Sequence, residues 1–157
     1  MEMTSIIAAR DLVKRFGSFQ AVKGISFEVE QGHCIGLLGP NGAGKTTTMR
    51  MIMGLSTVSG GRLAVFGAPV GAMTRAVKTK IGLVPQESNL DPDITVSENL
   101  EVYGRYFALP TNVIADRVPP LLEFMQLQEK SEARVTQLSG GMKRRLIIAR
   151  ALIGDPE

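Results

Sequence analysis

The chain has 157 residues, 44% of them hydrophobic, which is enough for one domain or a large part of one. Its formal net charge of +3 is too small to indicate nucleic-acid binding by itself, and its single cysteine, Cys34, excludes an internal disulfide framework. No apolar run approaches the roughly 20 residues of a membrane-spanning helix, and no signal peptide is evident. We therefore expect a cytoplasmic protein that reaches a membrane only through a partner.

The first thirty residues predict antiparallel strands. Residues 6–16 alternate apolar and charged side chains, which is typical of a strand with one solvated face. A turn at Gly17 leads to further predicted strands at residues 19–22 and 25–29. Phe16 ends the first strand, and its spacing fits two roles equally, either stacking on a nucleobase or filling an edge of the core.

Residues 39–46 read G-x-x-x-x-G-K-T, the pattern of a phosphate-binding loop. The apolar run 34–38 before it predicts a buried strand, and residues 47–53 after it predict a helix that ends near Gly54. Backbone N–H groups and the helix dipole make such a helix start a site for anions. The pattern arises by chance in on the order of 1% of chains of this length.

Each residue type in this loop suits a triphosphate. Glycines allow the backbone to turn tightly and to approach phosphate oxygens. Lys45 is placed to reach the β- and γ-phosphates, and the Thr46 hydroxyl to ligate Mg²⁺. The candidate nucleotide-binding residues of the loop are Gly39, Pro40, Asn41, Gly42, Ala43, Gly44, Lys45 and Thr46. The sequence therefore predicts a nucleoside triphosphate site.

The middle of the chain continues with alternating elements. We expect a short strand at residues 62–66, a short helix at 73–79 and a buried strand at 81–84, which Pro85-Gln86 ends. Residues 95–109 predict an amphipathic helix capped by Thr95 or Ser97.

The last third is expected to be helical. Residues 113–127 contain Pro119-Pro120, which predicts two shorter helices or a strong kink. Residues 143–153 predict a helix whose N-terminus lies at Ser139, Gly140 and Gly141, a second and weaker anion site.

Together, the phosphate loop, the Val84-Pro85-Gln86 segment and Leu138-Ser139-Gly140-Gly141-Met142 resemble the ATP-binding subunit of an ABC transporter over the whole chain. The resemblance implies ATP and Mg²⁺ as cofactors. It makes Phe16 the adenine-stacking aromatic and Thr47 a contact of the α-phosphate. Gln86 corresponds to the Q-loop glutamine near Mg²⁺ and the attacking water, so Gln86 and Lys45 are the candidate catalytic residues.

The same resemblance covers the serine and glycines before the last helix. Ser139, Gly140 and Gly141 match the signature motif that contacts a γ-phosphate, with Met142 in place of the usual glutamine. The neighbouring cations Lys143, Arg144 and Arg145 are expected to form a solvated helix face. The amino-acid sequence of residues 89–107 is similar to that of exporters of the daunorubicin-resistance and nodulation-factor type.

In the family, the Walker B aspartate, the catalytic glutamate and the switch histidine follow the position of Glu157. The 157 residues contain none of them, so we expect a partial ATPase domain that is inactive as given. The resemblance implies an α/β fold. It would comprise a P-loop core of parallel strands with an N-terminal antiparallel β subdomain (residues 1–94) and an α-helical signature subdomain (residues 95–150).

The expected function is ATP hydrolysis that drives export through a separate permease subunit. Two copies would join head to tail at the cytoplasmic face of the membrane, and no nucleic-acid partner is expected. The alternative is a soluble ABC-type ATPase of translation or DNA repair. The DNA-repair form would need a long coiled coil between Lys45 and Ser139, and the sequence has none.

Overall fold

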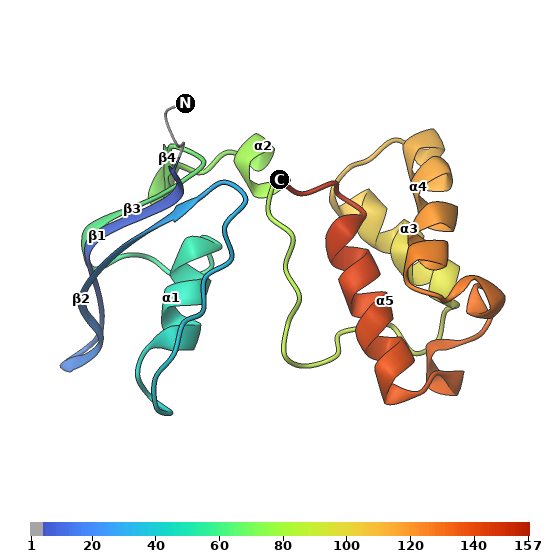
Figure 1. Ribbon diagram of the computed structural model, residues 1–157, viewed down its shortest axis with the longest axis horizontal. Coiled ribbons are helices and arrows are strands. Elements are labelled where there is room, and N and C mark those ends of the chain that lie inside the picture. The colour runs from blue at the N-terminus through green and yellow to red at the C-terminus, as the bar shows by residue number, and fades with distance from the viewer. Residues whose placement is uncertain (1–4) are drawn as a thin grey trace. The chain divides into compact units, whose positions relative to one another are not determined.

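The computed structural model describes residues 5–157. The chain forms two compact units, Met1–Lys78 and Thr79–Glu157, and each is described by itself. The first unit is a β-sheet with one main helix, and the second unit is a group of helices (Figure 1).

The sheet of the first unit is antiparallel throughout. Its strands are β1 (Ser5–Phe16), β2 (Phe19–Glu30), β3 (Gly60–Val65) and β4 (Ala68–Pro69), in the order β2-β1-β3-β4. The two predicted strands after the first turn are one continuous strand, β2, whose pairing with β1 shifts register at several points. Such bulges let a long hairpin stay paired while it twists. The predicted antiparallel β subdomain is confirmed.

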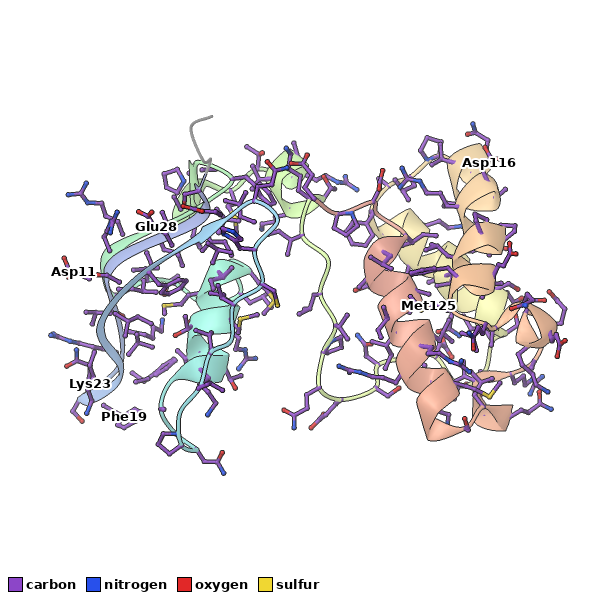
Figure 2. All side chains as sticks on the ribbon, in the orientation of Figure 1. Asp11, Phe19, Lys23, Glu28, Asp116 and Met125 are labelled. Atoms are coloured by element: carbon purple, nitrogen blue, oxygen red, sulfur yellow. The ribbon has the colours of Figure 1, made fainter. Side chains whose placement is uncertain are left out.

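Helix α1 (Lys45–Ile52) lies against one face of this sheet, where it contacts β2 and β3 (Figure 1). Charged side chains such as Asp11 and Lys23 project from the sheet into solvent (Figure 2). The buried apolar residues of this unit are Ala9, Leu12, Val22, Val29, Met51, Ile52, Leu63, Val65 and Val70. Two short helices, η1 (Val70–Ala72) and α2 (Arg75–Lys78), complete the unit.

The second unit packs three helices around an apolar core: α3 (Val96–Tyr106), α4 (Thr111–Phe124) and α5 (Gly140–Leu152). Thr95 begins α3 as predicted. Its Oγ1 accepts from the Glu98 N–H at 3.2 Å, and the Glu98 carboxylate accepts from the Thr95 N–H at 2.7 Å. This reciprocal arrangement satisfies two backbone donors at the helix start. The 3₁₀ helices η2 (Gln128–Lys130) and η3 (Val135–Gln137) connect α4 to α5.

The two prolines do not divide α4. The helix runs without interruption through Pro119 and Pro120, so of the two predicted outcomes, two shorter helices or a strong kink, the first is wrong. Prolines at these positions remove the hydrogen bonds to the carbonyls of Ala115 and Asp116. All four residues are exposed, so water can satisfy those carbonyls, while the opposite face of α4 stays anchored in the core.

Two predicted buried strands are not formed. Residues 34–38 are coil with an exposed Cys34 and with Leu38 95% exposed, and residues 81–84 are also coil. A strand of a parallel sheet needs a hydrogen-bonded neighbour, and within each unit the described residues provide none for these segments. The predicted parallel sheet is therefore absent from residues 5–157. Within the same range, no helix has the length and apolar character needed to cross a membrane.

Candidate functional site

The glycine-rich loop of residues 39–44 leads directly into α1. Gly44 is the N-cap residue of this helix, with a φ of 86°, and Lys45 is its first residue. The first N–H groups of a helix have no partner inside it, so they face outward at this end together with the positive end of the dipole. Thr48 is buried, and its N–H and Oγ1 both bind the Gly44 carbonyl, at 2.8 and 3.0 Å. The loop is thus fixed to the first turn of the helix.

The side chain of Lys45 folds back over the loop. Its Nζ donates to the carbonyls of Gly39 and Pro40, both at 2.8 Å. These two bonds hold the ammonium group against the loop instead of in bulk solvent. A fixed cation beside free N–H donors is the arrangement that binds a polyphosphate.

Glycine is required at Gly44 by its surroundings as well as by its positive φ. A Cβ there would lie well inside the 3.0 Å that real Cβ atoms keep from other atoms, against the Ala21 carbonyl oxygen of β2, and 3.1 Å from Val22 Cγ2. The loop therefore rests directly on the β2 backbone. By contrast, Gly42 also has a positive φ, 82°, but has open space around it.

A cavity of about 320 Å³ adjoins this contact between the loop and β2. Gly42 and Ala43 line it from the loop, and β2 contributes residues between Phe19 and Ile25. Phe19, 61% exposed, and Lys23 lie near the turn of the β1–β2 hairpin (Figure 2). The cavity is large enough for part of a small ligand and opens beside the phosphate loop. Phe19 is not among the residues predicted from the sequence, although an aromatic side chain beside a turn is a recognisable signal.

Phe16 lies at the end of β1, directly opposite Phe19 in the hairpin. It is 55% exposed, so its ring is available to a ligand, and Lys14 Nζ lies over the ring at 4.9 Å from the centroid. Lys14 is not among the predicted site residues, because a lysine on a strand is usually solvated. Lys14 is buried because the fold brings Thr57, 43 residues away along the chain, against its side chain.

The remaining loop residues keep their candidate roles. Thr46 is exposed in the first turn of α1, and Thr47 beside it is half-buried. Within residues 5–157, no three His, Cys, Asp or Glu side chains gather into a metal site. In nucleotide sites, Mg²⁺ is commonly held by one or two protein ligands together with waters and phosphate oxygens.

In the second unit, Gln86 is exposed in a loop that α5 holds on both sides. Arg144 Nη1 donates to the Pro85 carbonyl at 2.6 Å, and Arg150 Nη1 donates to the Asn89 carbonyl at 2.8 Å. Arg144 is exposed, in keeping with the expected solvated face, and Arg145 donates to the Gln126 side chain at 3.1 Å, so both cations also bind neighbouring loops.

Arg150 is buried, and its guanidinium lies 4.0 Å from the centre of the Tyr103 ring. Burial lowers the pKa of this guanidinium, and Tyr103 partly offsets the effect. The sequence signal for Arg150 was a charged residue at a core position of a helix, between Ala149 and Ala151, both buried.

Ser139 is the N-cap residue of α5, as predicted. Its Oγ accepts from the Met142 N–H at 3.3 Å. Gly140 and Gly141 are exposed, with open space where a Cβ would be, so the helix start is accessible to a ligand. Met142 packs against the core of the second unit, an apolar role in place of a polar signature residue.

A glycine-rich loop closed by a lysine at a helix N-terminus defines a P-loop protein. The model of the ABC transporter family matches residues 22–157, and the chain belongs to that family. A solved structure described as the ATP-binding subunit of an ABC transporter shares the fold with a TM-score of 0.84 and 25% identity, over 97% of this chain and 63% of the other.

Curated relatives agree with this assignment. The chain is 50% identical to the Nod factor export ATP-binding protein I of Cupriavidus metallidurans, over 99% of this chain and 51% of that protein. It is 54% identical to the protein of the same name from Rhizobium sp. (strain N33), over 92% of this chain and 47% of that protein. The chain thus spans about half the length of these relatives. The resemblance to the nodulation-factor type is confirmed.

Proposed function

We propose that this chain binds ATP with Mg²⁺ at residues 39–46 and belongs to the ATP-driven subunit of an exporter. The observation that carries the proposal is the Lys45 ammonium held over a glycine loop at a helix N-terminus, with Nζ 2.8 Å from two loop carbonyls. A triphosphate would exchange those carbonyls for charged oxygens, which are better partners for an ammonium ion. Comparison with transporter subunits does not favour a soluble ATPase of translation or DNA repair.

Each candidate residue then has a distinct task. Lys45 and the loop N–H groups bind the β- and γ-phosphates, Thr47 the α-phosphate, and Phe16 stacks on the base. Thr46 would hold Mg²⁺, which supplies charge neutralisation at the phosphates when bound. Gln86 keeps the catalytic role that the family resemblance implies.

The signature residues serve a second copy of the chain in this proposal. The exposed Ser139, Gly140 and Gly141 at the start of α5 would contact the γ-phosphate bound by the partner's loop in a head-to-tail dimer. A separate permease subunit would place this dimer at the cytoplasmic face of a membrane. Export is proposed because the named relatives are export proteins.

Calorimetric titration of Lys45→Ala with ATP and Mg²⁺ tests the site. Loss of a hydrogen bond to a charged group, about 1.5–3 kcal/mol, should weaken ATP binding roughly 10- to 150-fold. ADP should lose less, because the loop N–H groups and the helix dipole remain. Lys78→Ala, an exposed lysine on α2 of the same unit, is the matched control and should bind like the parent. Equal ATP affinity in Lys45→Ala and the parent would refute the phosphate-loop assignment.

A further inference from the structure

Lys14 is a buried lysine on a strand whose neighbours Arg15 and Phe16 are exposed. Only 6% of it is accessible. Its Nζ donates to the Thr57 carbonyl at 2.6 Å and to Thr57 Oγ1 at 3.1 Å, and it lies over the Phe16 ring. Burying an ammonium ion is costly unless every donor has a partner. Here the partners are two oxygens and the face of an aromatic ring.

The segment that binds Lys14 is itself pinned to β1. The Ser59 N–H donates to the Val13 carbonyl at 2.9 Å, and Ser59 Oγ accepts from the Arg15 N–H at 3.0 Å. Residues 57–59 therefore contact β1 immediately before and after Lys14. This double attachment leaves the ammonium group little freedom to move away from the ring above it.

The position of Lys14 also relates the Phe16 ring to the phosphate loop. Lys14 is paired with Val22 across the β1–β2 hairpin. Val22 and the preceding Ala21 carbonyl are the atoms against which Gly44 rests. The residue that contacts the Phe16 ring and the residues that contact the phosphate loop are thus neighbours in the β1–β2 hairpin. A shift of either would change the distance between base and phosphates.

We propose that Lys14 is a positioning residue for the nucleobase: it holds the Phe16 ring from one side so that the exposed ring surface can take a purine. The proposal rests on the nucleotide-binding function above. A cation beneath an aromatic ring fixes the orientation of the ring and withdraws electron density from it. Both effects favour stacking of an electron-rich base and have no bearing on the phosphates.

The test compares two ligands that differ in the base. ATP uses both the loop and the ring, whereas inorganic tripolyphosphate uses the loop alone. Lys14→Met keeps an unbranched, flexible side chain of nearly the same length and removes the charge and the donors. We expect it to weaken ATP binding about 3- to 10-fold, in line with the strength of partly desolvated cation–π contacts, and to leave tripolyphosphate affinity unchanged. In a Phe16→Leu background, the same substitution should have no further effect on ATP. Arg62→Met, on the exposed surface of β3, is the control.

The outcomes separate this inference from the proposed function. If Lys45→Ala weakens both ligands while Lys14→Met binds both like the parent, only the inference about Lys14 fails. If Lys45→Ala changes neither ligand, the nucleotide site itself is wrong. Equal weakening of both ligands by Lys14→Met would show a purely structural role and overturn the proposal. Should Lys14→Met not fold, Thr57→Val removes one acceptor from an exposed position and should weaken ATP alone, by about twofold.

Discussion

Gly44→Ala is the substitution whose effect the structure defines most directly. A left-handed backbone conformation costs a non-glycine residue about 1–2 kcal/mol. The added Cβ would also run into the Ala21 carbonyl of β2, and because this neighbour is backbone it cannot rotate away. Overpacking of this kind costs about 1–3 kcal/mol. The sum, about 2–5 kcal/mol, is a large part of the stability of a small unit.

Gly42→Ala separates the cost of the left-handed backbone conformation from the cost of overpacking. Gly42 has nearly the same φ, 82° against 86°, but nothing lies within 4 Å of its Cβ position. It should therefore lose only the conformational part. For a unit of this size, the remaining difference of about 1–3 kcal/mol corresponds to a melting midpoint at least about 4 °C lower in Gly44→Ala than in Gly42→Ala.

Thermal unfolding followed by circular dichroism gives the comparison, and hydrogen exchange of the α1 amides shows whether the loss is local. Gly44→Ala should open α1 more often, because the helix begins at the displaced residue. Equal midpoints for the two variants would refute the reasoning, since they would show that β2 yields to the new methyl group without cost.

Three further predictions concern the nucleotide and the second unit. Phe16→Ala should weaken ATP and GTP binding together by about 1–3 kcal/mol in calorimetry, because stacking tolerates either base; a larger loss in Phe19→Ala would move the stacking role to that ring. Arg150→Met should destabilise the protein in urea unfolding by about 1–3 kcal/mol, because the Asn89 carbonyl loses a charged donor; unchanged stability would show that this contact is replaced by water. A polypeptide of residues 1–157 should show no steady-state ATPase above background, because the family resemblance implies that the general base lies outside these residues; turnover that Lys45→Ala abolishes would contradict this.

Local features of the molecule followed from the sequence because the atoms that decide them are close together along the chain. Gly44, Lys45 and the start of α1 lie within a few residues of one another, and their conformation depends on glycine φ angles and on orphan N–H groups. The caps Thr95 and Ser139 follow the same logic, since each bonds to a backbone group three residues ahead. The β1–β2 hairpin also has a local turn.

Tertiary structure decided the features that need distant partners. Residues 34–38 are as apolar as a buried strand, but a parallel strand forms only beside hydrogen-bonded neighbours, and the sequence of the segment cannot supply them. Pro119 stays within a helix because its exposed side faces water. The positions of Lys14 and Arg150 are set by oxygens 43 and 61 residues away, at Thr57 and Asn89. Composition and periodicity describe neighbours along the chain, whereas a buried cation is placed by neighbours in space.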